Sequence, residues 1–138
     1  MGKTIISTKN SPAAIGPYSQ AINIKGGMTF TSGQIPLDLN TGKLVSGNFE
    51  EQVIQTLDNI RGILKERNCG LSNLIKLTVY LTDLSNFDEL NNIFEDYWSE
   101  WFDEKKIHYP SRSAVEVSKL PKNAQVEIEA IFYDYDKN

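Results

Sequence analysis

The chain has 138 residues, with 14 basic and 18 acidic side chains and a formal net charge of −4. This length fits one domain, residues 1–138, and a single cysteine, Cys69, excludes an internal disulfide framework and gives no zinc pattern. The acidic balance argues against broad nucleic-acid binding, and the lack of an apolar leader or a long apolar run predicts a cytoplasmic protein that does not span a membrane.

The first half of the chain predicts two strands followed by a helix. Residues 21–24 and 28–32 flank Lys25-Gly26-Gly27, where the glycines can adopt the positive φ of a tight hairpin turn, and residues 4–7 could form a further strand. Asn48 followed by Glu51 is typical of a helix cap. Apolar residues then recur at helical spacing and predict an amphipathic helix. They are Phe49, Val53, Leu57, Ile60 and Leu64. We expect the helix to end near Cys69 and Gly70.

The second half predicts a strand, a helix and two more strands. Polar residues alternate with four apolar residues that we expect on the buried face of a strand: Ile75, Leu77, Val79 and Leu81. Ser85 or Asn86 then caps a second helix with this apolar stripe: Phe87, Leu90, Phe94 and Tyr97, followed by Trp98, Trp101 and Phe102. Residues 110–130 read as strand, turn, strand, with the turn at residues 120–122.

These elements predict an α+β fold in which two helices cover one face of a sheet. The other face must then meet water or a partner. Alternation assigns to it a mixture of aromatic, hydroxyl and charged side chains that suits an oligomer interface: Lys76, Thr78, Tyr80, Glu127, Glu129, Ile131 and Tyr133.

The last third carries the charges that suggest a function. Arg112 is one of three arginines in the chain, and its planar fork suits a carboxylate. Glu127 lies on the uncovered face and could hold a water molecule. Together they indicate a small acidic ligand. Structural alternatives remain open, namely ion pairs of Arg112 with Glu116 and of Glu127 with Lys76 or with an arginine across an interface.

Four segments together carry a resemblance to a known family. They are AAIGPYSQA at residues 13–21, TSGQIP at 31–36, PSRSAVEV at 110–117 and QVEIEA at 125–130, and Asn59 joins them. From residue 3 to residue 133 the chain resembles the RidA (YjgF) family, the reactive intermediate imine/enamine deaminases. The resemblance implies a chorismate mutase-like mixed sheet, a homotrimer with sites between subunits, and hydrolysis of 2-iminobutanoate and 2-iminopropanoate to 2-oxo acids and ammonia.

The resemblance also implies roles for individual residues. Arg112 would bind the substrate carboxylate, while Glu127 and the main-chain carbonyl of Ala114 would position a water molecule. Many members of the family carry cysteine at this position. This chain has alanine there, so residue 114 cannot supply a reactive thiol. Four further residues match positions of the family's pocket: Tyr18, Ser32, Gly33 and Asn91. Tyr18 could instead pack across the interface, and Asn91 could instead bond to the backbone.

No cofactor is indicated. His108 is the sole histidine, which makes neither a metal cluster nor a triad, and Gly26-Gly27 lacks the spacing of a phosphate loop. Residues 99–108 form a longer segment than in well-known bacterial members, and this segment either extends the second helix or builds a lid. Two other functions stay open: a non-catalytic 2-oxo acid binding trimer, and the ribonuclease activity reported for relatives, against which the acidic balance argues.

Overall fold

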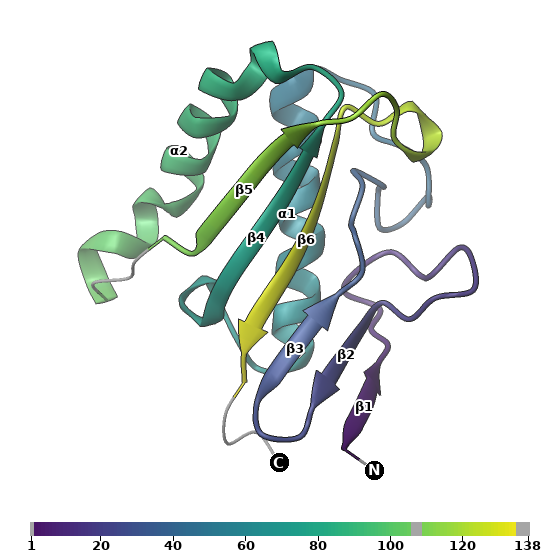
Figure 1. Ribbon diagram of the computed structural model, residues 1–138, viewed down its shortest axis with the longest axis vertical. Helices are drawn as coiled ribbons and strands as arrows, with labels where there is room; N and C mark the ends of the chain where they lie inside the picture. The colour runs from purple at the N-terminus through teal and green to yellow at the C-terminus, as the bar shows by residue number, and fades with distance from the viewer. Residues whose placement is uncertain (1, 106–108, 135–138) are drawn as a thin grey trace.

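A mixed sheet with two helices on one side forms the molecule (Figure 1). The computed structural model describes residues 2–105 and 109–134, with the side chains of residues 100–105 left aside. The strands run in the order β1-β2-β3-β6-β4-β5; β4 and β5 are parallel and the other neighbours are antiparallel. The elements are β1 Lys3–Ile6, β2 Ala21–Ile24, β3 Met28–Thr31, α1 Phe49–Glu66, β4 Leu74–Leu81, α2 Phe87–Lys105, β5 Ser111–Glu116 and β6 Val126–Tyr133.

The two faces of the sheet divide as the alternation predicts. Leu77 on β4 and Ile128 on β6 are fully buried, with their same-face neighbours, against apolar residues of the helices. α1 contributes Val53, Leu57, Ile60, Ile63 and Leu64 to this core, and α2 contributes Leu90, Ile93, Phe94 and Trp98. The residues predicted for the other face are half-buried or exposed: Lys76, Thr78, Tyr80, Glu127, Glu129, Ile131 and Tyr133.

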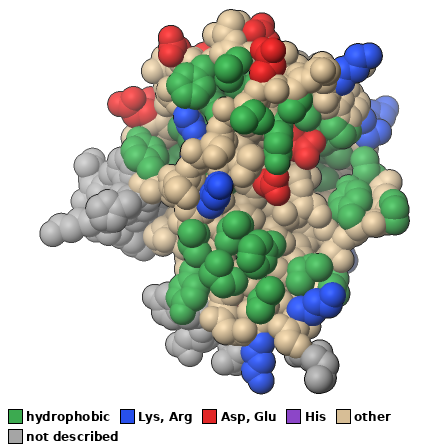
Figure 2. Space-filling model, viewed as in Figure 1, with side chains coloured by type: hydrophobic (Ala, Val, Ile, Leu, Met, Phe, Trp, Pro, Cys, Tyr) green, Lys and Arg blue, Asp and Glu red, His purple; other side chains and the backbone are tan. Residues whose placement is uncertain are grey.

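The uncovered face has an apolar part and an acidic part (Figure 2). Register places Phe30 beside Ile131, and Met28 beside Tyr133, on this face, so apolar groups gather where β2, β3 and β6 meet. Further along β6, Glu127 and Glu129 project from the same face next to β4. Such a mixed surface suits contact with another protein surface better than exposure to water alone.

Capping explains where the helices begin. The Asn48 side chain accepts a hydrogen bond of 2.9 Å from the Glu51 N–H, which confirms the predicted cap of α1. α1 ends at Glu66, a few residues before the expected turn. The cap predicted for the second helix at Ser85 or Asn86 stays a prediction, and the turn before α2 has a cap of its own. The Asp83 side chain accepts from the Ser85 N–H and opens a short 3-10 turn that leads into α2, because an aspartate just upstream caps a helical turn as well as serine or asparagine.

One detail of the sheet differs from the sequence-based prediction, and a second, the order of the last strands, was not predicted. A bulge between Leu74 and Lys76 breaks the alternation at the start of β4, so that Leu74 is buried and Ile75 is 39% exposed. The last two strands are not joined as neighbours, because β4 lies between β5 and β6. The link after β5 is therefore a crossover, and β5 is left as an edge strand.

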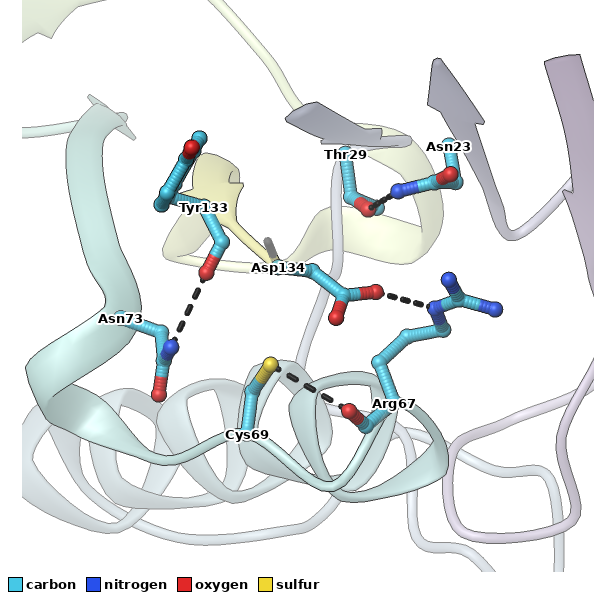
Figure 3. Close-up of polar contacts among 7 residues, drawn as sticks. All are labelled: Asn23, Thr29, Arg67, Cys69, Asn73, Tyr133 and Asp134. Carbon is cyan, nitrogen blue, oxygen red and sulfur yellow. Dashed lines mark hydrogen bonds and ion pairs between the residues drawn. The ribbon is translucent and has the colours of Figure 1, made fainter. Parts of the chain in front are cut away.

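Polar contacts fasten the end of β6 to the end of α1 (Figure 3). Arg67 follows α1 and donates from Nε to the buried carboxylate of Asp134, which follows β6. Asn73 donates to the Tyr133 carbonyl at 2.9 Å. Cys69 packs beside the core and its thiol donates to the Arg67 carbonyl at 3.4 Å, which indicates a structural role.

The longer segment at residues 99–108 extends α2 as far as Lys105. His108 and the side chains of Trp101 and Phe102 lie outside the described residues. In the part of the chain that the structure describes, no helix is long and apolar enough to cross a membrane.

Candidate active site

Arg112 lies on the helix-covered side of the edge strand. Its register partner on β4 is the buried Leu77, so both side chains point toward the helices. The guanidinium donates from Nη2 to Oδ1 of Asn91 on α2 at 2.7 Å. Its Cζ atom lies 5.4 Å from the ring centre of Phe87 and 5.1 Å from that of Phe94. One hydrogen bond and two aromatic rings thus fix the position of this cation.

The contacts of Arg112 settle two of the structural alternatives. Among the described residues no carboxylate forms an ion pair with Arg112, and Glu116 instead accepts a hydrogen bond from the Leu84 N–H. The ion pair with Glu116 is therefore wrong. Asn91 bonds to Arg112 and not to the backbone, so the structural alternative for this amide is wrong as well.

The guanidinium opens onto a pocket that suits an anion. Partial burial lowers the pKa of Arg112, because desolvation disfavours its charged form. A negatively charged ligand would offset that penalty, and the donors not used by Asn91 could reach it. The pocket has a volume of about 370 Å³ and is lined by Asn91, Phe94, Glu95, Tyr109, Pro110 and Arg112.

Ala114 lies two residues further along the same strand and also faces the helices. Its side chain packs against the core, next to its register partner Val79. The Val117 N–H donates to the Leu81 carbonyl on β4. Backbone groups alternate in direction along a strand, so those of Ala114 point to the open edge of the sheet. Its carbonyl is thus directed away from β4, as the predicted role requires.

Glu127 occupies a second pocket, formed by the N-terminal loops. A Cβ atom on residue 33 would overlap the Glu127 carboxylate, so Gly33 lets this side chain lie close to the backbone in its present position. Tyr18 and Ser32 line the same pocket, which has a volume of about 330 Å³. The other lining residues are Pro12, Ala13, Ile15, Gln34, Ile35, Leu37 and Pro121.

The carboxylates of Glu127 and Glu129 have different surroundings. Tyr80 donates its hydroxyl proton to Glu129, and this bond raises the pKa of Tyr80 to about 12. Glu127 accepts no hydrogen bond from a described residue and forms no ion pair with Lys76. Burial, and then the charge of Glu129, raise the pKa of Glu127. A half-buried carboxylate with a raised pKa is suited to exchanging protons with a ligand or a water molecule.

Tyr18 and Ser32 already have partners within the loops. The Tyr18 hydroxyl accepts from the Ile15 N–H at 3.1 Å, and its ring is 46% exposed at the pocket mouth. The Ser32 hydroxyl donates to the Ser19 carbonyl, so donating to a substrate would require this hydroxyl to rotate. Both residues lie beside Glu127, and their roles toward a ligand remain predictions.

One chain therefore carries two separate half-sites. Arg112, Asn91 and Ala114 belong to β5 and α2, whereas Glu127 projects from the opposite face of the sheet, beside Tyr80. The two pockets share no described lining residue. Sequence reasoning missed two residues of the Arg112 pocket, Glu95 and Tyr109. The four-residue spacing from Asn91 to Glu95 could have indicated Glu95, because it places these two residues on one side of α2.

Comparison with known proteins gives one consistent family. A family model described as Endoribonuclease L-PSP matches residues 8–133. A RutC family protein of Pyrococcus abyssi is 46% identical over 133 residues, which cover 96% of this chain and 98% of that protein. The human 2-iminobutanoate/2-iminopropanoate deaminase is 40% identical over 129 residues, covering 94% of this chain and 88% of the human protein.

A solved structure supports the same relationship. The crystal structure of Escherichia coli TdcF with bound serine is similar to this chain with a TM-score of 0.84 at 39% sequence identity. The similarity covers 94% of this chain and 98% of that chain. The α+β fold, with its mixed sheet and two helices, is therefore common to this chain and its structural neighbours.

Proposed function

We propose that this chain hydrolyses reactive 2-imino acids. The premise is that the chain belongs to the Endoribonuclease L-PSP family, which includes the RidA deaminases. The products are 2-oxo acids and ammonia, and 2-iminobutanoate and 2-iminopropanoate are the substrates suggested by the similarity to the human deaminase. The observation that carries the proposal is Arg112, a half-buried cation held by Asn91 with no ion pair to a described carboxylate.

In this mechanism the carboxylate of the substrate binds to the free edge of the Arg112 fork. Binding fixes the C2 carbon of the imine near a water molecule, so the addition occurs within a positioned complex. The Ala114 carbonyl and the Glu127 carboxylate accept hydrogen bonds from that water. Glu127 takes one proton from the water as the oxygen adds to C2 and passes it to the imine nitrogen, so that a neutral tetrahedral carbinolamine forms.

The carbinolamine then loses ammonia. Glu127 takes the proton of the carbinolamine hydroxyl and delivers it to the nitrogen, the C2–N bond breaks, and the oxygen becomes the C2 carbonyl oxygen. One imine and one water molecule give one 2-oxo acid and one ammonia, so the reaction needs no oxidant or reductant. Because imines already react with water, positioning and one proton acceptor suffice for a useful acceleration.

A complete site would need two copies of the chain. Arg112 and Glu127 lie on opposite faces of the sheet in separate pockets, so one copy cannot offer both to a small substrate. We infer a homotrimer in which Arg112 of one subunit meets Glu127 of the next. The apolar and acidic uncovered face and the open edge of β5 support such an assembly.

A binding function without turnover is the second candidate. The observation that favours it is that Arg112 is held in place without any contribution from Glu127. A 2-oxo acid could therefore bind to the Arg112 pocket and act as a signal. The two candidates differ in their need for Glu127, which only hydrolysis requires.

Ammonia release from a freshly generated imine tests the proposal directly. A pyridoxal-phosphate dehydratase acting on threonine or serine would supply the 2-imino acid, and its loss would be followed with and without this protein. Faster loss is the expected result. Binding of a 2-oxo acid without any acceleration would reject hydrolysis and favour the binding function.

A further inference from the structure

The pocket at Arg112 contains a negative charge as well as a positive one. Glu95 lines this pocket and lies four residues after Asn91 on α2. Residues four apart on a helix are neighbours, with Cβ atoms about 5–6 Å apart. The side chain of Glu95 therefore leaves α2 about one helical turn from that of Asn91, which holds Arg112. No ion pair joins Glu95 to a basic side chain that the structure describes.

An aromatic ring lies next to this carboxylate. Tyr109 lines the same pocket, on the segment that leads into β5, and its ring centre is 6.0 Å from that of the buried Trp98. Burial, and then the charge of Glu95, raise the pKa of Tyr109, which places the phenol within the field of the carboxylate. A pocket lined by both a carboxylate and an aromatic ring is a favourable site for an ammonium or guanidinium group.

We propose that Glu95, assisted by Tyr109, makes this pocket selective for 2-imino acids whose side chain carries a positive charge. The inference rests on the proposed function and extends its substrates from the short, uncharged side chains of 2-iminobutanoate and 2-iminopropanoate to longer side chains that carry a positive charge. The substrate carboxylate binds Arg112, and the side chain runs along α2 toward Glu95. The nitrogen on C2 is too close to the carboxylate to reach Glu95, so the selected cation belongs to the end of a longer side chain.

Arginine and citrulline provide a matched pair of probes, because they share length and shape and differ in the charge of the terminal group. An amino-acid oxidase that accepts both would generate the two imines, and the readout is the ratio of their kcat/KM values. For the natural protein we expect a preference for the arginine-derived imine of about two- to fivefold, because an ion pair with an exposed carboxylate contributes about 1 kcal/mol or less. In Glu95→Gln the ratio should fall to about one.

Glu89→Gln is the control, since Glu89 is exposed on the first turn of α2 and does not line the pocket. It removes the same charge from the same helix and should keep the preference. Unchanged melting temperatures would show that both variants are folded. Equal ratios in the natural protein and in Glu95→Gln would overturn the inference.

Calorimetric binding of arginine and citrulline separates this inference from the proposed function. If no imine is hydrolysed faster but arginine binds more tightly than citrulline, and Glu95→Gln removes the difference, hydrolysis is rejected and charge selection stands. If imines are hydrolysed without any preference in rate or binding, charge selection is rejected and hydrolysis stands. If neither hydrolysis nor binding is detected, both are rejected.

Discussion

Arg112 shows how single residues are prepared for a ligand. Asn91, Phe87 and Phe94 hold its guanidinium from one side, which leaves the other edge of the fork for a carboxylate. Arg112→Lys would keep the charge and lose the two-pronged geometry. A hydrogen bond to a charged group contributes about 1.5–3 kcal/mol, so kcat/KM should fall by at least roughly tenfold. Steady-state kinetics measure this, and near-natural values would remove Arg112 from the mechanism.

Glu127 leads to a prediction in which activity and stability change differently. Glu127→Gln keeps the size of the side chain but removes the proton acceptor, so kcat should fall by roughly a hundredfold. The raised pKa of Glu127 means that the folded protein favours the protonated form, so ionisation destabilises the fold as pH rises through that pKa. The uncharged amide avoids this penalty. The melting temperature of the variant at neutral pH should therefore not fall, and a large decrease would indicate a structural role.

The pH profile of the natural protein supplies a control on the same residue. Only ionised Glu127 accepts a proton, so kcat/KM should fall as pH decreases through a pKa above that of an ordinary glutamate. Glu129→Gln removes one of the two causes of the raised pKa, and its amide oxygen can still accept from Tyr80. The acid limb of this variant should move to lower pH. An acid limb that does not move would exclude Glu129 as a cause.

At the scale of elements, β5 contributes its backbone to the proposed mechanism. The role of Ala114 belongs to a carbonyl directed to the open edge of the sheet, and strand geometry fixes that direction whatever the side chain. Ala114→Cys should therefore leave kcat/KM within about twofold of the natural value, because a cysteine is a small, largely apolar side chain. A manyfold rise in rate that thiol alkylation abolishes would show that the mechanism lacks a nucleophile.

The link between α1 and β6 leads to a stability prediction (Figure 3). The side chain of Asp134 is fully buried, and Arg67 is its ion-pair partner. Arg67→Ala would leave this carboxylate buried without a partner, which should reduce the free energy of unfolding by about 3–5 kcal/mol. Urea unfolding at fixed protein concentration measures the change. Adding Asp134→Asn to Arg67→Ala should recover part of the loss, and a double variant less stable than Arg67→Ala would contradict this account.

At the scale of the whole molecule, the separation of the two half-sites leads to a complementation test. Arg112→Ala and Glu127→Gln should each lack most activity when alone. Mixed by unfolding and refolding in equal amounts, they should form some interfaces that combine an intact Arg112 with an intact Glu127. Random head-to-tail assembly would make such interfaces about one quarter of the total. Recovery approaching that fraction of the natural rate is the expected result.

A chain that completes its site alone would show no recovery on mixing, and light scattering at a monomer mass would reject the trimer as well. The control is a mixture of each variant with itself, refolded in the same way. Natural protein refolded alongside sets the scale of recoverable activity. Together these measurements distinguish a shared site from a site within one copy.

The sequence by itself determined the features that depend on local periodicity. Alternation along β4 and β6 separated the buried face from the charged face, helical spacing located α1 and α2, and Asn48 marked the start of α1. The strength of these patterns comes from burial, because each element must hide its apolar side from water. Family motifs added the candidate residues, and all of them except Ala114 line one of the two pockets.

Only the tertiary structure decided which strands are neighbours, where a bulge interrupts the alternation, and which residues meet in each pocket. The bulge after Leu74 exposes Ile75, and the position of β5 beside β4 turns Arg112 toward α2 and away from Glu127. Because Arg112 points toward α2, Glu95 on that helix lines the Arg112 pocket. Strand order, bulges and pairing depend on contacts between residues far apart in the chain, where a shift of one residue reverses every side chain, and local periodicity does not contain that information.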